Sequence, residues 1–132
     1  MDVLEILLVE DNPGDVRLTQ EALRESKIHY HLTVASDGIQ ALEMLASSTR
    51  TVRPNVILLD LNLPGKNGLE ILDDLKADND LKEIPIIVLT SSENDLDVLV
   101  AYKKQASAYL VKPATLNQFD EVINAIVTLC TL

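Results

Sequence analysis

The chain has 132 residues, of which 47% are hydrophobic, and these values are typical of one domain with its own hydrophobic core. Its formal net charge of -10 argues against nucleic acid or an anionic membrane surface as a direct ligand, because both carry negative phosphate groups. A single cysteine, Cys130, excludes an internal disulfide, and without a secretory signal or a membrane-length apolar stretch a cytoplasmic location is expected.

Residues 4–9 form a largely apolar run that predicts the first strand, and two carboxylates, Glu10 and Asp11, follow it. The turn composition of residues 12–15 precedes a run with helical spacing, for which Asp15 is the expected N-cap. Residues 31–35 alternate between polar and apolar side chains and predict a half-buried strand near a sheet edge. A second helix then begins at residues 36–38, with an expected apolar stripe of Ile39, Leu42, Leu45 and Ala46.

Residues 56–59 lack polar alternation and therefore predict a strand that is buried on both faces. Asp60 follows directly, at the carboxyl end of the strand, where open α/β sheets bind ligands. A carboxylate in that place needs a partner, because burying an unpaired charge is costly. The next helix carries Asn67 and Glu70 at capping-box spacing, and its buried face is expected to consist of Leu69, Leu72 and Leu75.

Residues 84–89 are another apolar run, which ends in Thr90, and Ser92 with Asp95 is expected to cap the helix that follows. Residues 108–111 predict a short last strand that ends in Lys112 and Pro113. Thr115 and Gln118 have capping-box spacing before the last helix, whose inward face is expected to hold Phe119, Val122, Ile123, Ile126 and Val127.

Strands and helices alternate about five times, without an internal linker or a second domain. Such alternation predicts an α/β fold, in which a parallel sheet carries helices on both faces and the crossovers are right-handed. Because the carboxyl ends of parallel strands share one edge of the sheet, the polar residues after the four strands should converge. They are Glu10, Asp11, Asp60, Thr90 and Lys112.

Acids placed together repel at neutral pH and need a cation, and a site with only oxygen ligands favours Mg²⁺. A lysine and a hydroxyl beside such a cation make a site for a phosphoryl group, whose oxygens need positive charge and hydrogen-bond donors.

With these residues in this order, the chain resembles a response regulator receiver domain, the phosphoacceptor half of two-component signalling. The likeness covers the whole chain. A narrower likeness, to the stand-alone regulators paired with cyanobacterial phytochrome kinases, rests on residues 12–15, 53–55 and 59–64. The motifs that carry the family resemblance are Leu8-Val9-Glu10-Asp11, Leu58-Leu59-Asp60 with Leu63-Pro64 and Gly68, Leu89-Thr90, and Lys112-Pro113.

The resemblance implies a single receiver domain over residues 1–132, with no output domain and a doubly wound, five-stranded sheet of flavodoxin-like order 2-1-3-4-5. It implies a phosphoprotein of a phosphorelay and not an enzyme, apart from self-catalysed phosphotransfer and autodephosphorylation. The implied partners are a sensor histidine kinase, phytochrome-type on the narrower likeness, or a phosphotransfer protein, and a downstream protein.

The resemblance also implies roles for single residues. Asp60 would accept the phosphoryl group from a kinase phosphohistidine. Asp11, Asp60 and the backbone carbonyl of Asn62 would hold Mg²⁺, and Glu10 would act directly or through water. Lys112 would bind a phosphoryl oxygen.

Two further residues would carry the switch. Thr90 would shift towards the phosphoryl group, and Tyr109 would move inward into the space that Thr90 leaves. This change would alter the surface formed by the fourth helix, the fifth strand and the fifth helix. The peptide bond between Lys112 and Pro113 is expected to be cis, as in the family.

Three other functions remain open. A magnesium-dependent phosphohydrolase with an aspartyl nucleophile usually has a second acid two residues later, where this chain has Asn62. A flavodoxin-like cofactor site would need a phosphate-binding loop after the first strand, where Glu10 and Asp11 would repel phosphate. A phosphate-independent adaptor is disfavoured by the intact acids, Thr90 and Lys112.

The end of the last helix is more apolar than one buried stripe requires, with Leu129, Cys130 and Leu132. Packing of this tail on the core is one explanation, and an exposed apolar interface is the other. The second explanation is slightly favoured and predicts a homodimer.

Overall fold

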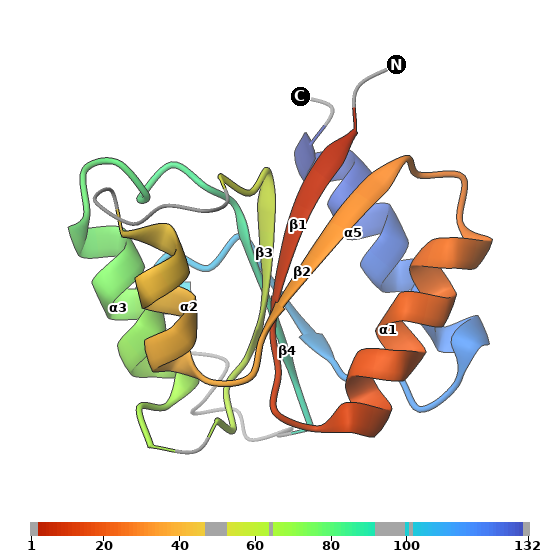
Figure 1. The fold of residues 1–132 in the computed structure, drawn as a ribbon, viewed down its shortest axis with the longest axis horizontal. Helices are drawn as coiled ribbons and strands as arrows, with labels where there is room; N and C mark the ends of the chain where they lie inside the picture. Colours follow the sequence, from red (N-terminus) through yellow and green to blue (C-terminus); the bar gives the residue numbers. More distant parts are fainter. Residues whose placement is uncertain (1–2, 47–52, 64, 92–99, 101, 131–132) are drawn as a thin grey trace.

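The computed structural model describes residues 3–46, 53–63, 65–91, 100 and 102–130. Its five strands form one parallel sheet in the order β2-β1-β3-β4-β5, which confirms the predicted doubly wound α/β fold (Figure 1). The strands are β1 (Leu4–Val9), β2 (Tyr30–Ala35), β3 (Val56–Asp60), β4 (Ile86–Thr90) and β5 (Ala108–Val111).

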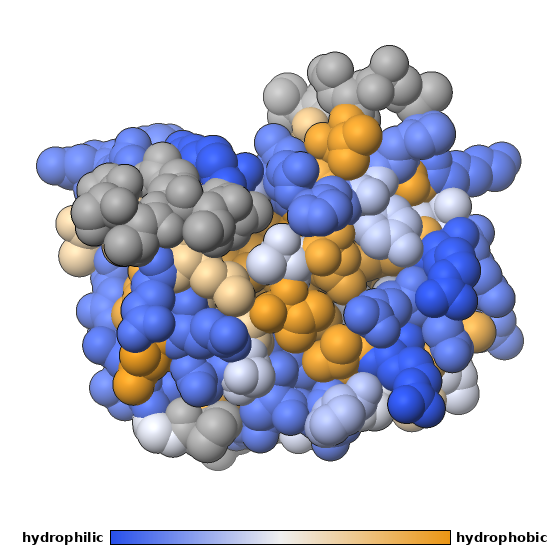
Figure 2. All heavy atoms as spheres, in the orientation of Figure 1, coloured by the Kyte–Doolittle hydropathy of each residue, from blue (hydrophilic) through white to orange (hydrophobic). Residues whose placement is uncertain are grey.

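Helices cover both faces of this sheet (Figure 1). One layer contains α1 (Pro13–Glu25) and α5 (Asp120–Cys130), which follows the short 3-10 helix η1 (Leu116–Phe119). The other layer contains α2 (Gly38–Leu45) and α3 (Gly68–Ala77). Figure 2 looks towards the edge strand β2, where apolar side chains gather between the helical layers and hydrophilic ones cover the helices.

The central strand β3 is buried along its whole length, as its apolar run predicts. Because successive side chains of a strand point to opposite faces, β3 contributes to both halves of the core. Ile57 and Leu59 lie in the cluster beneath α2 and α3, and Val56 and Leu58 lie in the cluster beneath α1 and α5. Burial on both faces holds the end of β3, and with it Asp60, in one position.

Two predictions about the first two helices were wrong in detail. The N-cap of α1 is Asn12, whose Oδ1 accepts a hydrogen bond from the backbone N–H of Asp15 at 3.1 Å. Asp15 is already the third residue of the helix, so its side chain is free for another contact. In α2, which begins where predicted, the buried residues are Gly38, Ala41 and Leu45, while Ile39, expected in the buried stripe, is 58% exposed. The small Gly38, not Ile39, packs against Ile71 of α3.

Of the two capping boxes expected in the later helices, the one at Asn67 is confirmed and the one at Thr115 was wrong. Asn67 caps α3 by accepting a 3.0 Å hydrogen bond from the backbone N–H of Glu70. Thr115 makes no capping hydrogen bond at η1, and Gln118 Oε1 instead accepts from the backbone N–H of Ala114 at 2.6 Å. The apolar side chains buried on α3 are Ile71, Leu72 and Leu75, and those buried on η1 and α5 are Phe119, Val122 and Ile126. Of the other residues expected to face inward, Leu69 and Ile123 are half-buried and Val127 is exposed.

The apolar end of α5 is partly folded onto the core. Leu129 and Cys130 are half-buried against the cluster beneath α1 and α5, while Val127 is 40% exposed. The predictions for Pro64, for the helix capped by Ser92 and Asp95, and for Leu132 fall outside the described residues. None of the described helices is both long and apolar enough to cross a membrane.

Candidate functional site

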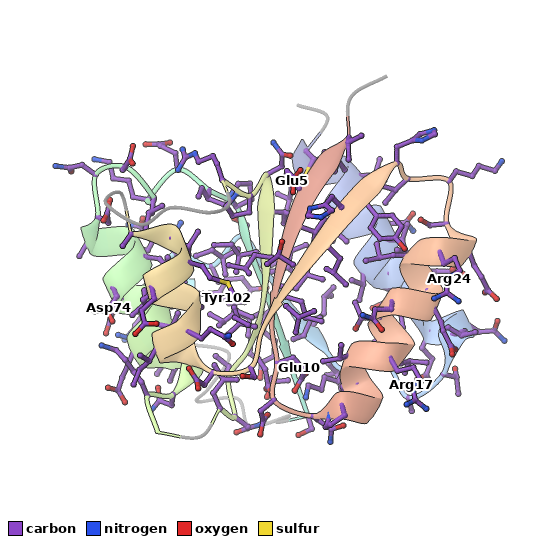
Figure 3. All side chains as sticks on the ribbon, in the orientation of Figure 1. Glu5, Glu10, Arg17, Arg24, Asp74 and Tyr102 are labelled. Carbon is purple, nitrogen blue, oxygen red and sulfur yellow. The ribbon has the colours of Figure 1, made fainter. Side chains whose placement is uncertain are left out.

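The strands end side by side at one edge of the sheet. Val9 is in register with Leu59, and the backbone N–H of Lys112 donates a 2.9 Å hydrogen bond to the carbonyl of Thr90. Glu10, which Figure 3 labels at the end of β1, lies beside the start of α1. The polar residues predicted to converge are therefore together at this edge: Glu10, Asp11, Asp60, Thr90 and Lys112.

The Lys112 ammonium is the centre of the site. Its Nζ lies 2.8 Å from Glu10 Oε1, 2.8 Å from Asp15 Oδ2 and 3.1 Å from Asp60 Oδ2. A lysine ammonium has three N–H donors, so these three carboxylates use all of them. The predicted convergence of Lys112 with the acids is thus seen in the structure, with one additional acid.

That additional acid, Asp15, was predicted only as a helix cap. The one sequence signal for it is the position of Asp15 in the first turn of the helix that leaves this edge, close in the chain to Glu10 and Asp11. Its contact with Lys112 joins residues 97 positions apart, and such a contact is not visible in local periodicity.

Asn62 connects two of the predicted residues. Its backbone N–H donates to Asp60 Oδ1 at 2.9 Å, and its side-chain Nδ2 donates to Thr90 Oγ1 at 3.0 Å. Asp60 is 2% exposed and Thr90 is completely buried, so the acceptor of each bond is buried while the donor, Asn62, is exposed. The carboxylate of Asp60 is therefore held through both oxygens, by Asn62 on one side and by Lys112 on the other.

The acids fit a divalent cation. Glu10, Asp11 and Asp60 each offer a carboxylate oxygen, and these oxygens lie within 4.8 Å of one another. Glu10 and Asp60 are buried, whereas Asp11 is exposed. With Asp15, the site contains four carboxylates and only one ammonium, that of Lys112, and the excess negative charge and oxygen donors suit a hard cation.

The electrostatics of the site reflect this crowding. Burial raises the pKa of Glu10 to about 7, and the charge of Asp60 adds to the effect while the hydrogen bond from Lys112 opposes it. Burial also acts to lower the pKa of Lys112, but hydrogen bonds to Asp15 and Glu10 outweigh burial and raise that pKa above its ordinary value. Lys112 is therefore a permanent cation at neutral pH, while Glu10 is close to its titration point.

The site opens into a cavity of about 580 Å³, lined by residues that include Asp11, Asp60, Asn62 and Lys112. A cavity of that size beside a carboxylate, an ammonium and a cation-binding group of acids leaves room for a phosphoryl group. The arrangement can bind a divalent cation and an anionic group next to each other.

One expectation about the backbone was wrong. The bond between Lys112 and Pro113 is trans, and the described residues contain no cis peptide bond. The trans form is the intrinsically preferred one before proline, and Lys112 reaches its three carboxylates with it.

Tyr109 lies two residues before the end of β5, in register with Val88, while Thr90 is in register with Val111. Its side chain is half-buried and packs against the cluster beneath α2 and α3. Tyr109 is thus close in register to Thr90, and its inward movement stays a prediction.

Comparison with known proteins agrees with this geometry. A family model described as the response regulator receiver domain matches residues 6–124. Response regulator Rcp1 of Synechocystis sp. is 43% identical over 124 residues, which cover 92% of this chain and 84% of that protein.

Two solved structures are similar over nearly the whole chain. The phosphorylated cyanobacterial phytochrome response regulator RcpA superposes with a TM-score of 0.86 at 38% identity, covering 98% of this chain and 95% of that one. The Mn²⁺-bound form of Rcp1 superposes with a TM-score of 0.83 at 41% identity, covering 95% and 92%. The likeness includes every strand that carries the site.

Proposed function

The chain belongs to the response regulator receiver domain family, and we propose that Asp60 is the residue that accepts its phosphoryl group. The observation that carries this proposal is the position of Asp60, buried at the end of β3, with its Oδ2 3.1 Å from Lys112 Nζ. Glu10 and Asp11 lie beside it, within range of a shared cation. As a member of this family, the chain is a signalling domain of two-component systems.

In the proposed reaction, a carboxylate oxygen of Asp60 attacks the phosphorus of a phosphohistidine on a sensor kinase. The new P–O bond forms as the P–N bond breaks, and the electron pair of that bond leaves with the imidazole nitrogen. Phosphoryl transfer depends mainly on positioning and on charge stabilisation. Here the chain positions Asp60 through Asn62 and supplies positive charge through Lys112.

Asp11, Asp60 and the backbone carbonyl of Asn62 would hold Mg²⁺, with Glu10 bound directly or through water. When bound, Mg²⁺ supplies positive charge opposite the phosphoryl oxygens. An aspartyl phosphate carries roughly 1.5 to 2 negative charges in place of the one on the Asp60 carboxylate, in a site that already contains several carboxylates. Lys112 must therefore exchange one of its carboxylate contacts for a phosphoryl oxygen.

Thr90 and Tyr109 would carry the signal to the surface. Thr90 Oγ1 accepts a hydrogen bond from Asn62 Nδ2, and this bond must be exchanged when Thr90 turns to a phosphoryl oxygen. Tyr109, from the neighbouring strand, would then pack further inward and change the surface around β5 and α5. Such a switch biases a surface between two states.

The phosphodonor would be a sensor histidine kinase of the phytochrome type, because the structure of RcpA is described as that of a phytochrome response regulator. A downstream protein would bind the switched surface. The homodimer expected from the last helix stays a prediction, supported by the exposed side chain of Val127 and weakened by the packing of Leu129 and Cys130.

The test is incubation with acetyl phosphate, with and without Mg²⁺, for wild type, Asp60→Asn and a control, Asp120→Asn, which changes an exposed acid. Intact mass and peptide mapping should show one phosphoryl adduct, on Asp60, in wild type and in the control, and only with Mg²⁺. An adduct-free, folded wild type would contradict the proposal and favour a phosphate-independent adaptor. Steady release of phosphate from simple monoesters would favour a phosphohydrolase.

A further inference from the structure

Asp15 has a contact that the roles given above do not explain. Its Oδ2 lies 2.8 Å from Lys112 Nζ, as close as Glu10 and closer than Asp60. The side chain of Asp15 is 36% exposed and lines the cavity that also contains Asp60 and Lys112.

The backbone fixes Asp15 in this position from both sides. Its N–H donates to the N-cap side chain of Asn12 at 3.1 Å, and its carbonyl accepts from Thr19 Oγ1 at 2.9 Å. Because Asn12 is the cap of α1, the carboxylate of Asp15 is not used for capping and can face Lys112. The start of the helix thus aims this carboxylate at the site.

Asp15 differs from the other two partners of Lys112 in one respect. Glu10 and Asp60 belong, with Asp11, to the acids that can share a cation, and Asp15 does not belong to that group among the described residues. A divalent cation bound by those acids would neutralise part of the negative charge that attracts the Lys112 ammonium, and it would also repel that ammonium. Of the three carboxylates that contact Lys112, that of Asp15 is the one that the cation would not bind.

We propose that Asp15 is a positioning residue, which retains the Lys112 ammonium in the site when a divalent cation occupies the acids Glu10, Asp11 and Asp60. The inference rests on the proposed function, because a retained ammonium is useful only if Lys112 has an incoming phosphoryl oxygen to bind. When Asp60 is phosphorylated, its carboxylate loses its charge, and the donor of Lys112 that faced Asp60 passes to a phosphoryl oxygen. Glu10 and Asp15 keep the remaining two donors.

A simpler role for Asp15 is that of an acid in the first turn of α1, where it interacts favourably with the helix dipole. That role and the positioning role both predict lower stability for Asp15→Asn, so stability does not separate them. The state of the Lys112 ammonium and the phosphorylation rate at saturating Mg²⁺ do separate them, because a helix-dipole effect changes neither.

The first measurement is heteronuclear NMR of the lysine ammonium groups in wild type and Asp15→Asn, with the Lys112 signal assigned by its absence in Lys112→Arg. A hydrogen-bonded ammonium signal should persist in wild type when Mg²⁺ is added, and it should be lost in Asp15→Asn. Loss of the signal in wild type on addition of Mg²⁺ would overturn the proposal, even if the variant did not fold.

The second measurement is the rate of Asp60 labelling by acetyl phosphate at saturating Mg²⁺. Asp15→Asn should be slower by about tenfold, since it loses a charged hydrogen bond to Lys112. Asp15→Glu, which keeps the carboxylate, should recover the rate to within about threefold. Glu25→Gln, an exposed charge change on the same helix, should match wild type.

The outcomes distinguish the two proposals. If wild type acquires no adduct on Asp60, the proposed function fails. If wild type is labelled and Asp15→Asn is labelled equally fast, the function stands and the role given to Asp15 is wrong. A slow Asp15→Asn that Asp15→Glu does not rescue also contradicts a role for the carboxylate.

Discussion

The side-chain amide of Asn62 donates a 3.0 Å hydrogen bond to the hydroxyl of Thr90, a completely buried residue at the end of β4. The backbone N–H of the same Asn62 donates to Asp60. One residue therefore connects the proposed phosphoacceptor and the proposed switch threonine, by its backbone on one side and by its side chain on the other.

This division of contacts predicts the behaviour of Asn62→Ala. The variant should lose about 1 kcal/mol of unfolding free energy, because Thr90 loses a buried hydrogen-bond donor. Its Mg²⁺ affinity should stay within about threefold of wild type, because the proposed ligand at this position is a backbone carbonyl. Calorimetric Mg²⁺ titration checks this, with Asp11→Asn as the variant that should bind weakly. A large loss of affinity in Asn62→Ala would show that its side chain takes part.

The meeting of the site residues at one edge of the sheet was predictable from sequence, while the individual contacts of the Lys112 ammonium were not. The burial of β3 places Asp60 at the sheet edge, and this follows from an apolar run without polar alternation. The pairing of Lys112 with Asp15 depends instead on the direction in which α1 leaves the sheet, which local periodicity does not determine. In α2 the predicted start is right, but the expected stripe counted only large apolar residues, and the small Gly38 and Ala41 occupy the buried face in place of Ile39. For this reason Ile39 was expected inside and lies outside.

The three carboxylates around Lys112 predict the effect of Lys112→Met, which removes the charge and keeps much of the side-chain length. Without the ammonium, the ionised carboxylates of Glu10, Asp15 and Asp60 repel one another, and the metal-free domain should lose about 3 kcal/mol at alkaline pH, where Glu10 is ionised. Added Mg²⁺ should restore part of this loss and bind more tightly than in wild type, because the competing cation is gone. Urea unfolding with and without Mg²⁺ measures both effects.

Lys104→Met is the matched control for that experiment. Lys104 pairs with Asp73, whose side chain is 57% exposed, and exposed ion pairs contribute at most about 1 kcal/mol. Equal losses of stability in the two variants, or no response of Lys112→Met to Mg²⁺, would contradict the electrostatic account of the site.

Gly68, the first residue of α3, predicts a steric effect on the site. A Cβ at this position would lie 2.5 Å from the carbonyl oxygen of Asp60 and 2.5 Å from Leu61 Cα, so the backbone beyond β3 would have to shift. Gly68→Ala should therefore lose about 3 kcal/mol of stability and slow the labelling of Asp60. In Gly38→Ala, the nearest atoms belong to the buried side chain of Ile71 and not to the backbone beyond β3, so this variant should also lose about 1 to 3 kcal/mol but without slower labelling. Similar labelling rates in the two variants would show that the backbone near Asp60 tolerates the shift.

The raised pKa of Glu10 predicts how the stability of the metal-free domain depends on pH. The carboxyl has an ordinary pKa of 4.5 in the unfolded chain and a pKa of about 7 in the folded one, chiefly because it is buried. Between these values the unfolded chain binds fewer protons than the folded chain, so the unfolding free energy falls as the pH rises. Glu10 makes its full contribution to the unfolding free energy below pH 4.5, and this contribution is lost as the pH rises through about 7.

Glu10→Gln should remove this dependence, because an amide does not titrate. The difference in unfolding free energy between Glu10→Gln and wild type should grow by about 3 kcal/mol from acid to alkaline pH in chelator, in favour of the variant. Mg²⁺ should shrink the difference at alkaline pH, because it stabilises the ionised carboxylate in wild type. The exposed Glu25→Gln should give a flat difference over the same range. A flat difference for Glu10→Gln as well would mean that Glu10 titrates in the folded domain as it does in the unfolded chain, with Lys112 offsetting its burial.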